Sequence, residues 1–298
     1  MLYRITFGFF RTKIRIVTNA KYIADFMSKE LKNSYVAQIT SILSNDNGYI
    51  EKVIAESQIG VAIVPGQTIE GSINYYGVVI PLLQITTFDN MQPKRVFLNS
   101  VVAEALKDRC IPIHASTVSN NERAFAFSGN KNSGKSTLTI SQVLWKDCLF
   151  VSDDITFVGI DNNHNVVCDG IFNGVHIFES EKYIYKNRIF CSGRDSSEFL
   201  KRRMIFKSDF LTHNPIELEA FLFPTINDDL SSGNIEPLSI NEARIAIQNN
   251  MIRFGVCYSD SIDSTINTIC EQTKMFRFQI GENFLESMEF VYYSFVNT

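Results

Sequence analysis

The chain has 298 residues, 45% of them hydrophobic and 20% charged, which is enough for one large domain or two modest ones with a sizeable core. A formal net charge of −4 argues against a dedicated nucleic-acid binder. No apolar run approaches the roughly 20 residues of a transmembrane helix, and the amino-terminal residues lack a signal-peptide pattern. We therefore expect a cytoplasmic protein whose partners include neither nucleic acid nor a membrane.

The cysteine pattern indicates free thiols. Six cysteines are scattered along the chain, with no C-x-x-C pair and no histidine at metal-ligand spacing: Cys110, Cys148, Cys168, Cys191, Cys257 and Cys270. In a cytoplasmic protein we expect such residues to be core thiols rather than disulfides or zinc ligands.

Residues 1–92 are predicted to form a smaller amino-terminal α+β domain. Apolar and charged residues alternate at 3–7 and 13–17, which predicts a β-hairpin around Gly8. The other elements expected from apolar spacing and turn residues are a helix at 20–31 and strands at 60–66 and 77–82. No recognisable chemistry lies in this block, so we expect a structural or substrate-recognition role.

Residues 93–298 are predicted to form the second domain. A helix at about 94–108 leads into a strand at 111–119, and a turn at 120–123 reverses the chain. His114 would therefore lie on a strand antiparallel to the next one. A lone histidine on a strand is usually a core residue, but this position makes a catalytic role equally plausible, and both interpretations stay open.

The sequence G-x-x-x-x-G-K-S follows, between an apolar strand at 123–128 and an amphipathic helix at 137–146. Strand, glycine loop and helix together form the setting of a nucleotide-binding P-loop, with the helix amino terminus directed at a phosphate. A chance Gly/Ser/Lys turn is the alternative, and the flanking elements argue against it. The predicted ATP-binding residues are Gly129, Asn130, Lys131, Asn132, Ser133, Gly134, Lys135, Ser136 and Thr137.

Each residue type in this loop has a physical role. The glycines let the backbone curl, so that successive N–H groups point at an anion. Lys135 would place a positive charge on the β- and γ-phosphates, and the hydroxyl of Ser136 would ligate Mg²⁺. ATP and Mg²⁺ are therefore the expected cofactors.

Two adjacent carboxylates, Asp153 and Asp154, end the apolar strand that starts at Cys148. P-loop proteins present a carboxylate beside Mg²⁺ and the attacking group in this way. One carboxylate can hold the metal while the other takes a proton from a substrate hydroxyl. A simple Asp-Asp turn between two strands is the alternative, which we consider the weaker one because of the position relative to Lys135.

The remainder of the chain is predicted to be β-rich. Strands are expected at 155–160, 165–168, 173–178 and 219–226, with a helix at 239–249. That helix would begin with a capping box, since Glu242 follows Ser239 by three positions. Glu179 is a weaker metal-ligand candidate. The basic residues Lys201, Arg202 and Arg203 belong either to a solvated face or to a mobile loop that closes a cation over the transferred phosphate.

The motifs around His114-Ala115-Ser116, the G-x-x-x-x-G-K-S-T loop and Val151-Ser152-Asp153-Asp154 occur in this order and at close spacing. Together they resemble the HPr kinase/phosphorylase family, and more narrowly the HPr-kinase-related proteins of bacterial peptide-modification gene clusters. The resemblance covers about residues 110–180. Residues 1–92 do not match the family's usual amino-terminal domain, so HPr itself is not the implied substrate.

The resemblance implies an α/β, β-rich fold whose P-loop core is similar to that of HPr kinase and phosphoenolpyruvate carboxykinase. It implies ATP-dependent phosphorylation of a hydroxyl on a protein or peptide. Asp153 would match the catalytic carboxylate that acts as base, and His114 the histidine near the phosphate. Ser136 and Asp154 would lie in the metal neighbourhood.

We therefore predict an ATP- and Mg²⁺-dependent kinase that acts on a serine or threonine hydroxyl of a protein or precursor peptide. Two alternatives remain from the sequence: a kinase for a small metabolite such as free serine or a sugar, and a nucleotide-binding regulatory module without transfer activity. The adjacent carboxylates argue against the second alternative, because a sensor has less need of a base. A homo-oligomer is also compatible with the sequence.

Overall fold

The computed structural model describes residues 2–10, 12–18, 21–32, 34–39, 59–63, 72–75, 78–81, 95, 98–99, 102–103, 106–178, 190–195, 201–212, 214–227, 229–254, 256, 258 and 261–296. The chain separates into two compact units, Met1–Ala105 and Leu106–Thr298. The described residues contain no helix long and apolar enough to cross a membrane.

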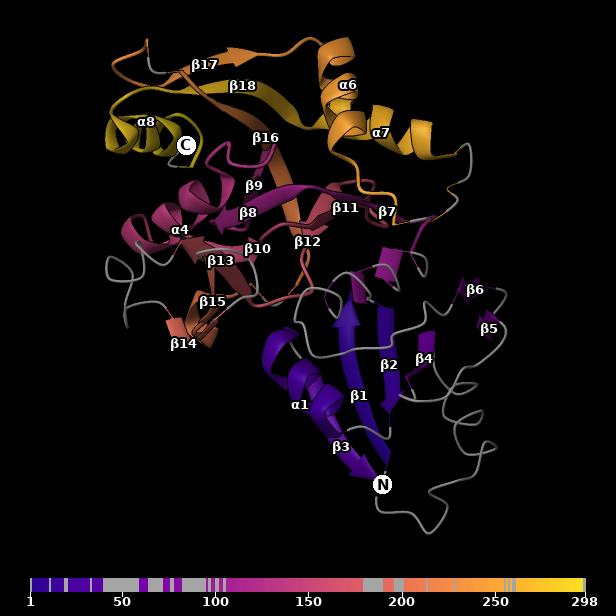
Figure 1. Cartoon of the computed structure of the whole chain (residues 1–298). Helices are drawn as coiled ribbons and strands as arrows, with labels where there is room; N and C mark the ends of the chain where they lie inside the picture. Colours follow the sequence, from indigo (N-terminus) through magenta and orange to yellow (C-terminus); the bar gives the residue numbers. More distant parts are fainter. Residues whose placement is uncertain are drawn as a thin grey trace. The chain divides into compact units, whose positions relative to one another are not determined.

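The first unit is built on a four-stranded sheet with the order β3-β1-β2-β4 (Figure 1). Its elements are β1 (Leu2–Phe9), β2 (Thr12–Thr18), α1 (Lys21–Glu30), β3 (Ser34–Ile39) and β4 (Ile59–Ile63), with a separate hairpin of β5 (Ser72–Tyr75) and β6 (Val78–Pro81). β1 is antiparallel to β2 and β3, whereas β4 is parallel to β2. The described part of this unit thus contains both a helix and a sheet.

The amino-terminal hairpin turns later than the sequence predicted. Gly8 lies inside β1, paired with Lys13, and the turn contains Phe10, whose φ is 47°. The prediction of a turn at Gly8 was wrong because the buried alternation continues past it: Phe7 and Phe9 both lie in the core. A helix was expected at 94–108. The described positions of this segment up to residue 103 are helical and buried, namely 95, 98, 99, 102 and 103. Residues 106–109 form a turn instead.

The second unit contains a nine-stranded, mainly antiparallel sheet. Its strands are β7 (Cys110–Ile113), β8 (Ala115–Asn120), β9 (Arg123–Ser128), β10 (Leu149–Ser152), β11 (Thr156–Ile160), β12 (Val166–Asp169), β16 (Ile216–Ile226), β17 (Asn234–Pro237) and β18 (Lys274–Ile280). The main order is β10-β8-β9-β16-β12-β11-β7, with β18 also on β16 and β17 on β18. The unit is thus α/β and β-rich, as expected.

Strand β16 joins the parts of this sheet. One edge pairs in parallel with β9, while the other pairs first with β12 and then, from Ala220 onward, in parallel with β18. Its two faces are covered as well, since Ala220 and Leu222 pack in one core cluster and Phe221 and Phe223 in the other. This explains the continuous, buried apolar run of these four residues.

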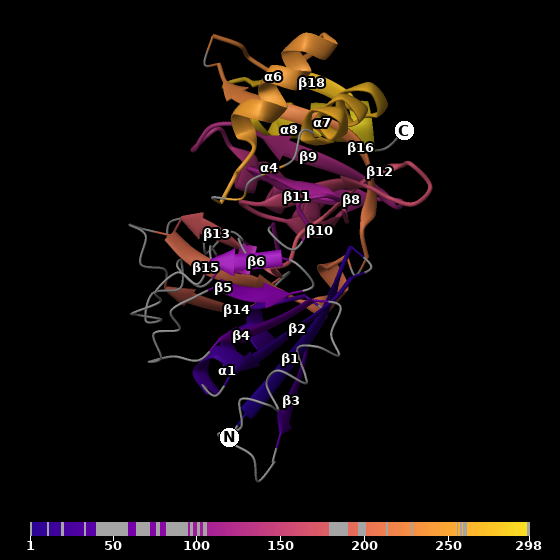
Figure 2. The same cartoon turned by 90° about the vertical axis from the view of Figure 1, so that its right-hand side faces the viewer.

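Helices cover both faces of the sheet (Figures 1 and 2). They are α4 (Lys135–Trp145), α6 (Ile240–Asn250), α7 (Ser261–Gln272) and α8 (Phe284–Val291), followed by a π-helix at Tyr292–Val296. Strand β9 shows the division: Phe125 and Phe127 pack in the cluster that includes α4, while Ala124 and Ala126 pack in the cluster that includes α6 and α7. The larger residues face one layer and the smaller ones the other, because successive strand side chains alternate in direction.

Local expectations in this unit hold in several places. The capping box of α6 is confirmed, since Glu242 N–H donates to Ser239 Oγ and Ser239 N–H donates to Glu242 Oε2. Among the described cysteines, Cys110, Cys148, Cys168 and Cys270 are buried free thiols, also as expected. Burial raises the pKa of Cys148 to about 12, so this thiol is a packing group rather than a nucleophile.

A small three-stranded sheet completes the unit, with β15 (Lys201–Phe206) between β13 (Gly174–Phe178) and β14 (Phe190–Asp195). A short 3-10 helix, Ser208–Phe210, follows β15. Val175 and Ile177 of β13 are buried in the α4 cluster, which fixes the strand against the large sheet. This attachment brings β13 to the end of β10.

Candidate functional site

The loop between β9 and α4 has the curled backbone that the sequence predicted. Asn132 and Gly134 have positive φ values of 66° and 89°. A Cβ atom at Gly134 would lie 3.1 Å from Ile280 Cδ1, so both space and conformation favour glycine here. α4 then begins at Lys135, and its first N–H groups and dipole face the loop. The strand–loop–helix prediction is confirmed.

Lys135 is folded back into this loop. Its Nζ donates to the carbonyl oxygens of Gly129 at 2.9 Å and Asn130 at 2.6 Å. Two carbonyl groups of the loop thus hold the ammonium group of a lysine that is 6% exposed as a residue. Ser133 adds a buried hydroxyl that has no hydrogen-bond partner among the described residues. A buried hydroxyl of this kind is costly unless something bonds to it, and it lies within the predicted anion cradle.

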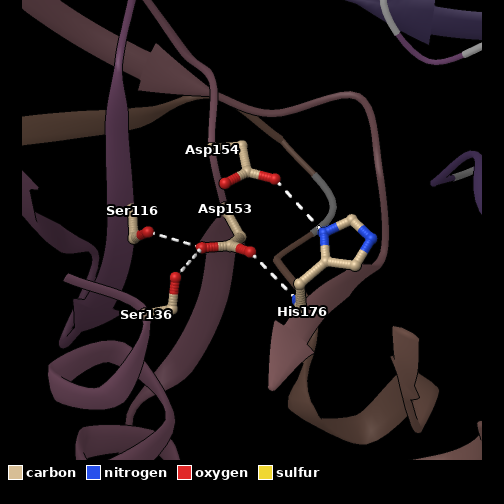
Figure 3. Close-up of polar contacts among 5 residues, drawn as sticks. All are labelled: Ser116, Ser136, Asp153, Asp154 and His176. Carbon is tan, nitrogen blue, oxygen red and sulfur yellow. Dashed lines mark hydrogen bonds and ion pairs between the residues drawn. The ribbon is translucent and has the colours of Figure 1, made fainter. Parts of the chain in front are cut away.

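Asp153 lies directly after β10 and is 5% exposed. Its Oδ1 accepts hydrogen bonds from Ser116 Oγ at 2.5 Å and from Ser136 Oγ at 2.8 Å (Figure 3). Its Oδ2 accepts a bond from the backbone N–H of His176 at 3.2 Å. A buried carboxylate with donors on both oxygens is held in one orientation. The bond from Ser136 joins the predicted phosphate loop to the predicted catalytic pair.

Asp154 differs from its neighbour in every respect. Its φ is 65°, in the left-handed region, and its side chain is 48% exposed. Its Oδ2 lies 3.3 Å from Nδ1 of His176 (Figure 3). The left-handed turn therefore directs the two consecutive carboxylates to separate partners, one to the serines and the other to an imidazole.

One ligand atom from each of Asp153, Asp154 and His176 falls within a span of 4.8 Å. Two carboxylates and an imidazole are a donor set that suits a divalent cation. The structure thus brings together Ser136, Asp153 and Asp154, the three residues for which the sequence predicted base and metal roles. Those roles themselves remain predictions.

His114 occupies the break between β7 and β8, where the predicted single strand is interrupted. Its N–H donates to the carbonyl oxygen of Asn250 at 2.7 Å, and its own carbonyl accepts from Ser128 Oγ at 3.1 Å. Burial, and next the charge of Lys135, lower the pKa of the ring, while Asp154 and Asp153 partly offset that shift. The ring is therefore mainly neutral at pH 7 and lies within the electrostatic field of the site.

Two further sequence candidates have different outcomes. Glu179 lies outside the described residues. The basic run at 201–203 forms the start of β15, so the mobile-loop interpretation is wrong for these residues. In the register of β13 and β15, Arg203 is directly opposite His176, whereas Arg202 is opposite Ile177.

Sequence analysis missed three residues of the site: Ser116, Gly170 and His176. His176 had a usable signal, because it alternates with the apolar residues Val175 and Ile177 on a strand and so faces away from their core. Gly170 had no such signal, because its role depends on the close approach of its backbone to another strand. A Cβ there would lie 2.4 Å from Ser152 Cβ and 2.9 Å from the Val151 carbonyl oxygen, on the strand that delivers Asp153.

No family model and no curated protein matches this chain. Among solved structures, the chain is similar to the HPr(Ser) kinase/phosphatase from Coxiella burnetii, with 11% sequence identity and a TM-score of 0.34 over 61% of this chain and 95% of that chain. A likeness of this size concerns the general fold at most. Function is therefore inferred from the contacts of the residues themselves.

Proposed function

We propose that this protein is an ATP- and Mg²⁺-dependent kinase that transfers the γ-phosphate to a serine or threonine hydroxyl of a protein or peptide. The observation that carries the proposal is the hydrogen bond from Ser136 Oγ to Asp153 Oδ1 at 2.8 Å. It connects a curled, lysine-containing loop at a helix amino terminus to a pair of carboxylates. Phosphoryl transfer needs both parts next to each other.

The loop supplies binding and charge neutralisation. Its backbone N–H groups and the amino terminus of α4 are positioned to receive phosphate oxygens. Lys135 now bonds to the carbonyls of Gly129 and Asn130, and in the complex it would exchange them for phosphate oxygens. The buried hydroxyl of Ser133 is available as a further donor. Such fixed donors stabilise charge without reorganising at the moment of reaction.

Asp153 orients the acceptor. Its Oδ1 already accepts from two hydroxyl groups, which is the same contact that an acceptor serine or threonine would make. The acceptor oxygen bonds to the γ-phosphorus as the bond from that phosphorus to the bridging oxygen breaks. ADP leaves, and the hydroxyl proton passes to the Asp153 carboxylate. His114, held neutral nearby, adds no positive charge that would compete for this carboxylate.

Ser136 and Asp154 would hold Mg²⁺, which neutralises charge on the phosphates when bound. The residues fit that role, since Ser136 opens the helix beside the loop and Asp154 presents a half-exposed carboxylate. If Ser136 turns to the cation, Asp153 Oδ1 loses one of its two hydroxyl donors. The lone pair that Ser136 had occupied on Asp153 Oδ1 then becomes available to the acceptor hydroxyl. In this way, binding of the nucleotide and its cation would free Asp153 for the acceptor.

The nature of the acceptor is the least constrained part of the proposal. Residues 1–92 carry no catalytic motif, and we assign to them the recognition of the protein or peptide. Incubation of the full chain with γ-³²P-ATP and Mg²⁺ tests this, with Ser/Thr-containing peptide libraries, free serine and sugars as separate acceptors. The proposal is supported if the wild-type chain transfers radioactive label to peptides and the K135A variant does not.

The other outcomes each have a defined meaning. Label on free serine or a sugar alone would identify a metabolite kinase. ATP binding without transfer to any acceptor, together with a conformational response to nucleotide, would identify a regulatory module. Failure of the chain to bind ATP at all would overturn the nucleotide-binding assignment of the loop.

A further inference from the structure

We propose that Asp153, Asp154 and His176 form a cation site with an imidazole ligand, and that this site binds Mn²⁺ in preference to Mg²⁺. The catalytic use of this cation rests on the function proposed above, but the site itself does not. His176 is thereby assigned as a metal ligand beside the predicted Asp154, and Asp153 faces the cation with one oxygen while its Oδ1 remains for the acceptor hydroxyl of the proposed function.

The spacing of the three groups fits one ion. With metal–ligand bonds of about 2.1 Å, neighbouring ligand atoms of an octahedral ion lie about 3.0 Å apart and opposite ones about 4.2 Å apart. Asp154 Oδ2 and His176 Nδ1 are separated by 3.3 Å, which matches a neighbouring pair. The full set falls within 4.8 Å, so small side-chain rotations are sufficient to enclose an ion.

The fold fixes both sides of the site before any ion binds. β13 is an edge strand of its sheet, and its outward N–H at His176 donates to Asp153 Oδ2. Val175 and Ile177 on either side are buried in the core, so the His176 side chain projects to the opposite face, toward Asp154. Ser116 holds the far oxygen of Asp153 at 2.5 Å. Bonds of this kind orient the ligands of protein metal sites.

A simple ion pair between His176 and Asp154 is the alternative explanation of their contact. It accounts for the contact of these two groups, but not for the arrangement in which a ligand atom of the buried Asp153 falls within the same 4.8 Å span. Two carboxylates this close repel each other, and a cation bound between them relieves that repulsion.

The imidazole decides which cation is favoured. Mg²⁺ prefers a shell of oxygen ligands and keeps several waters, whereas imidazole nitrogen favours first-row transition ions. Mn²⁺ accepts both carboxylate oxygen and imidazole nitrogen, and it is paramagnetic. It therefore serves as the probe of the comparison with Mg²⁺.

The test uses the nucleotide-free full chain, titrated with MnCl₂ and separately with MgCl₂ as competitor. Free Mn²⁺ is followed by its EPR signal, and bound Mn²⁺ is examined for nitrogen modulation of its electron spin echo. When wild-type protein is prepared with ¹⁵N-histidine, the ¹⁴N modulation should disappear and that of ¹⁵N should take its place. This step needs no substitution, so it does not depend on the folding of a variant.

The variants assign the nitrogen. H176Q should lose the modulation and bind Mn²⁺ roughly 10- to 100-fold more weakly, as is usual when a group around a metal is removed, with a smaller change for Mg²⁺. H164Q is the matched control, because His164 is exposed in the β11–β12 turn and should behave as wild type. D154N should keep the modulation but bind more weakly.

Three results would overturn the proposal: no Mn²⁺ binding, binding without a histidine modulation, or a modulation that persists in H176Q and disappears in H114Q. These outcomes are separate from the fate of the proposed kinase activity. Phosphate transfer with Mg²⁺ but without a histidine signal would contradict only the assignment of His176 as a metal ligand. Histidine-bound Mn²⁺ in a protein that transfers no phosphate would contradict only the proposed kinase activity.

Discussion

The loop between β9 and α4 and the carboxylate cluster are built in opposite ways. The loop is one continuous segment, residues 129–136, and its bonds from Lys135 to Gly129 and Asn130 span only a few positions. The cluster takes Ser116 from β8, two aspartates from the end of β10 and His176 from β13. Its partners are separated by between 22 and 37 positions, apart from the contact with Ser136.

This difference affects how each part responds to change. The loop depends on residues whose own backbone preferences create its shape, so a substitution there should act mainly on ligand binding. The cluster depends on the docking of strands from separate segments, so a distant change that shifts β10 or β13 should disturb it. Substitutions can test that contrast, beginning with the largest expected effect.

Replacing Asp153 by Asn should reduce phosphate transfer by roughly 10²- to 10⁴-fold, the usual contribution of a general base, while ATP affinity is nearly kept. The amide retains the shape of the side chain but cannot take the hydroxyl proton. Single-turnover transfer and equilibrium binding of ATP measure the two effects separately. Near-normal transfer in D153N would remove this residue as the base, and D154N is the paired comparison for cation affinity.

Replacing Lys135 by Ala should weaken ATP binding by roughly ten- to a hundredfold, since hydrogen bonds from charged groups contribute about 1.5–3 kcal/mol. Binding of ATP measured by calorimetry checks this. K131A is the control, because it keeps the backbone N–H that Lys131 gives to the loop and removes only an exposed side chain, so it should bind ATP nearly as wild type. Equal affinities in K135A and wild type would contradict the phosphate-cradle assignment.

Replacing Gly170 by Ala should destabilise the fold by about 1–3 kcal/mol, as expected of an inserted methyl group that forces the backbone to shift. The added Cβ would meet Ser152 and the Val151 carbonyl, immediately before the aspartates. Because β10 must move, Mn²⁺ binding should also weaken, whereas ATP binding should change less. Urea unfolding and metal titration provide the two measurements. An unchanged free energy of unfolding would show that β10 can shift to accommodate the added methyl group at little cost.

Replacing Ser239 by Ala should lower the thermal midpoint by less than G170A does, without affecting either half of the site. The substitution removes the reciprocal bonds of the α6 capping box, on an exposed helix end. Calorimetric unfolding together with ATP and Mn²⁺ binding checks the result. A loss of binding in S239A would indicate that general destabilisation, rather than local geometry, explains the effect of G170A.

The smallest expected effect concerns the pH dependence of stability through His114. Its pKa in the folded protein is lowered from 6.5 by burial and then by Lys135. Between 6.5 and that lower value the unfolded chain binds more protons, so the free energy of unfolding should decrease as pH falls through this window. Above 6.5 the contribution is constant. H114Q should flatten this part of a urea-unfolding profile, with H164Q as the control, and an unchanged slope would contradict the shifted pKa.

Sequence alone determined the features whose causes are local. Strand β9 was predicted with its observed bounds, 123–128, because a short apolar run between turn residues leaves few alternatives. The capping box at Ser239 was predicted because its two bonds link residues three positions apart. The prediction that Asp153 and Asp154 lie beside the loop required only that the strand end next to α4, and the bond from Ser136 confirms their proximity.

Only the tertiary structure decided what depends on the docking of distant segments. His176 and Ser116 belong to strands that sequence analysis recognised, yet nothing local indicates that the edge of β13 meets the end of β10. Gly170 is required by an approach to Ser152 that no spacing rule reveals. The loop is thus encoded by its own residues, whereas the cluster depends on packing, which forms only when the whole unit folds.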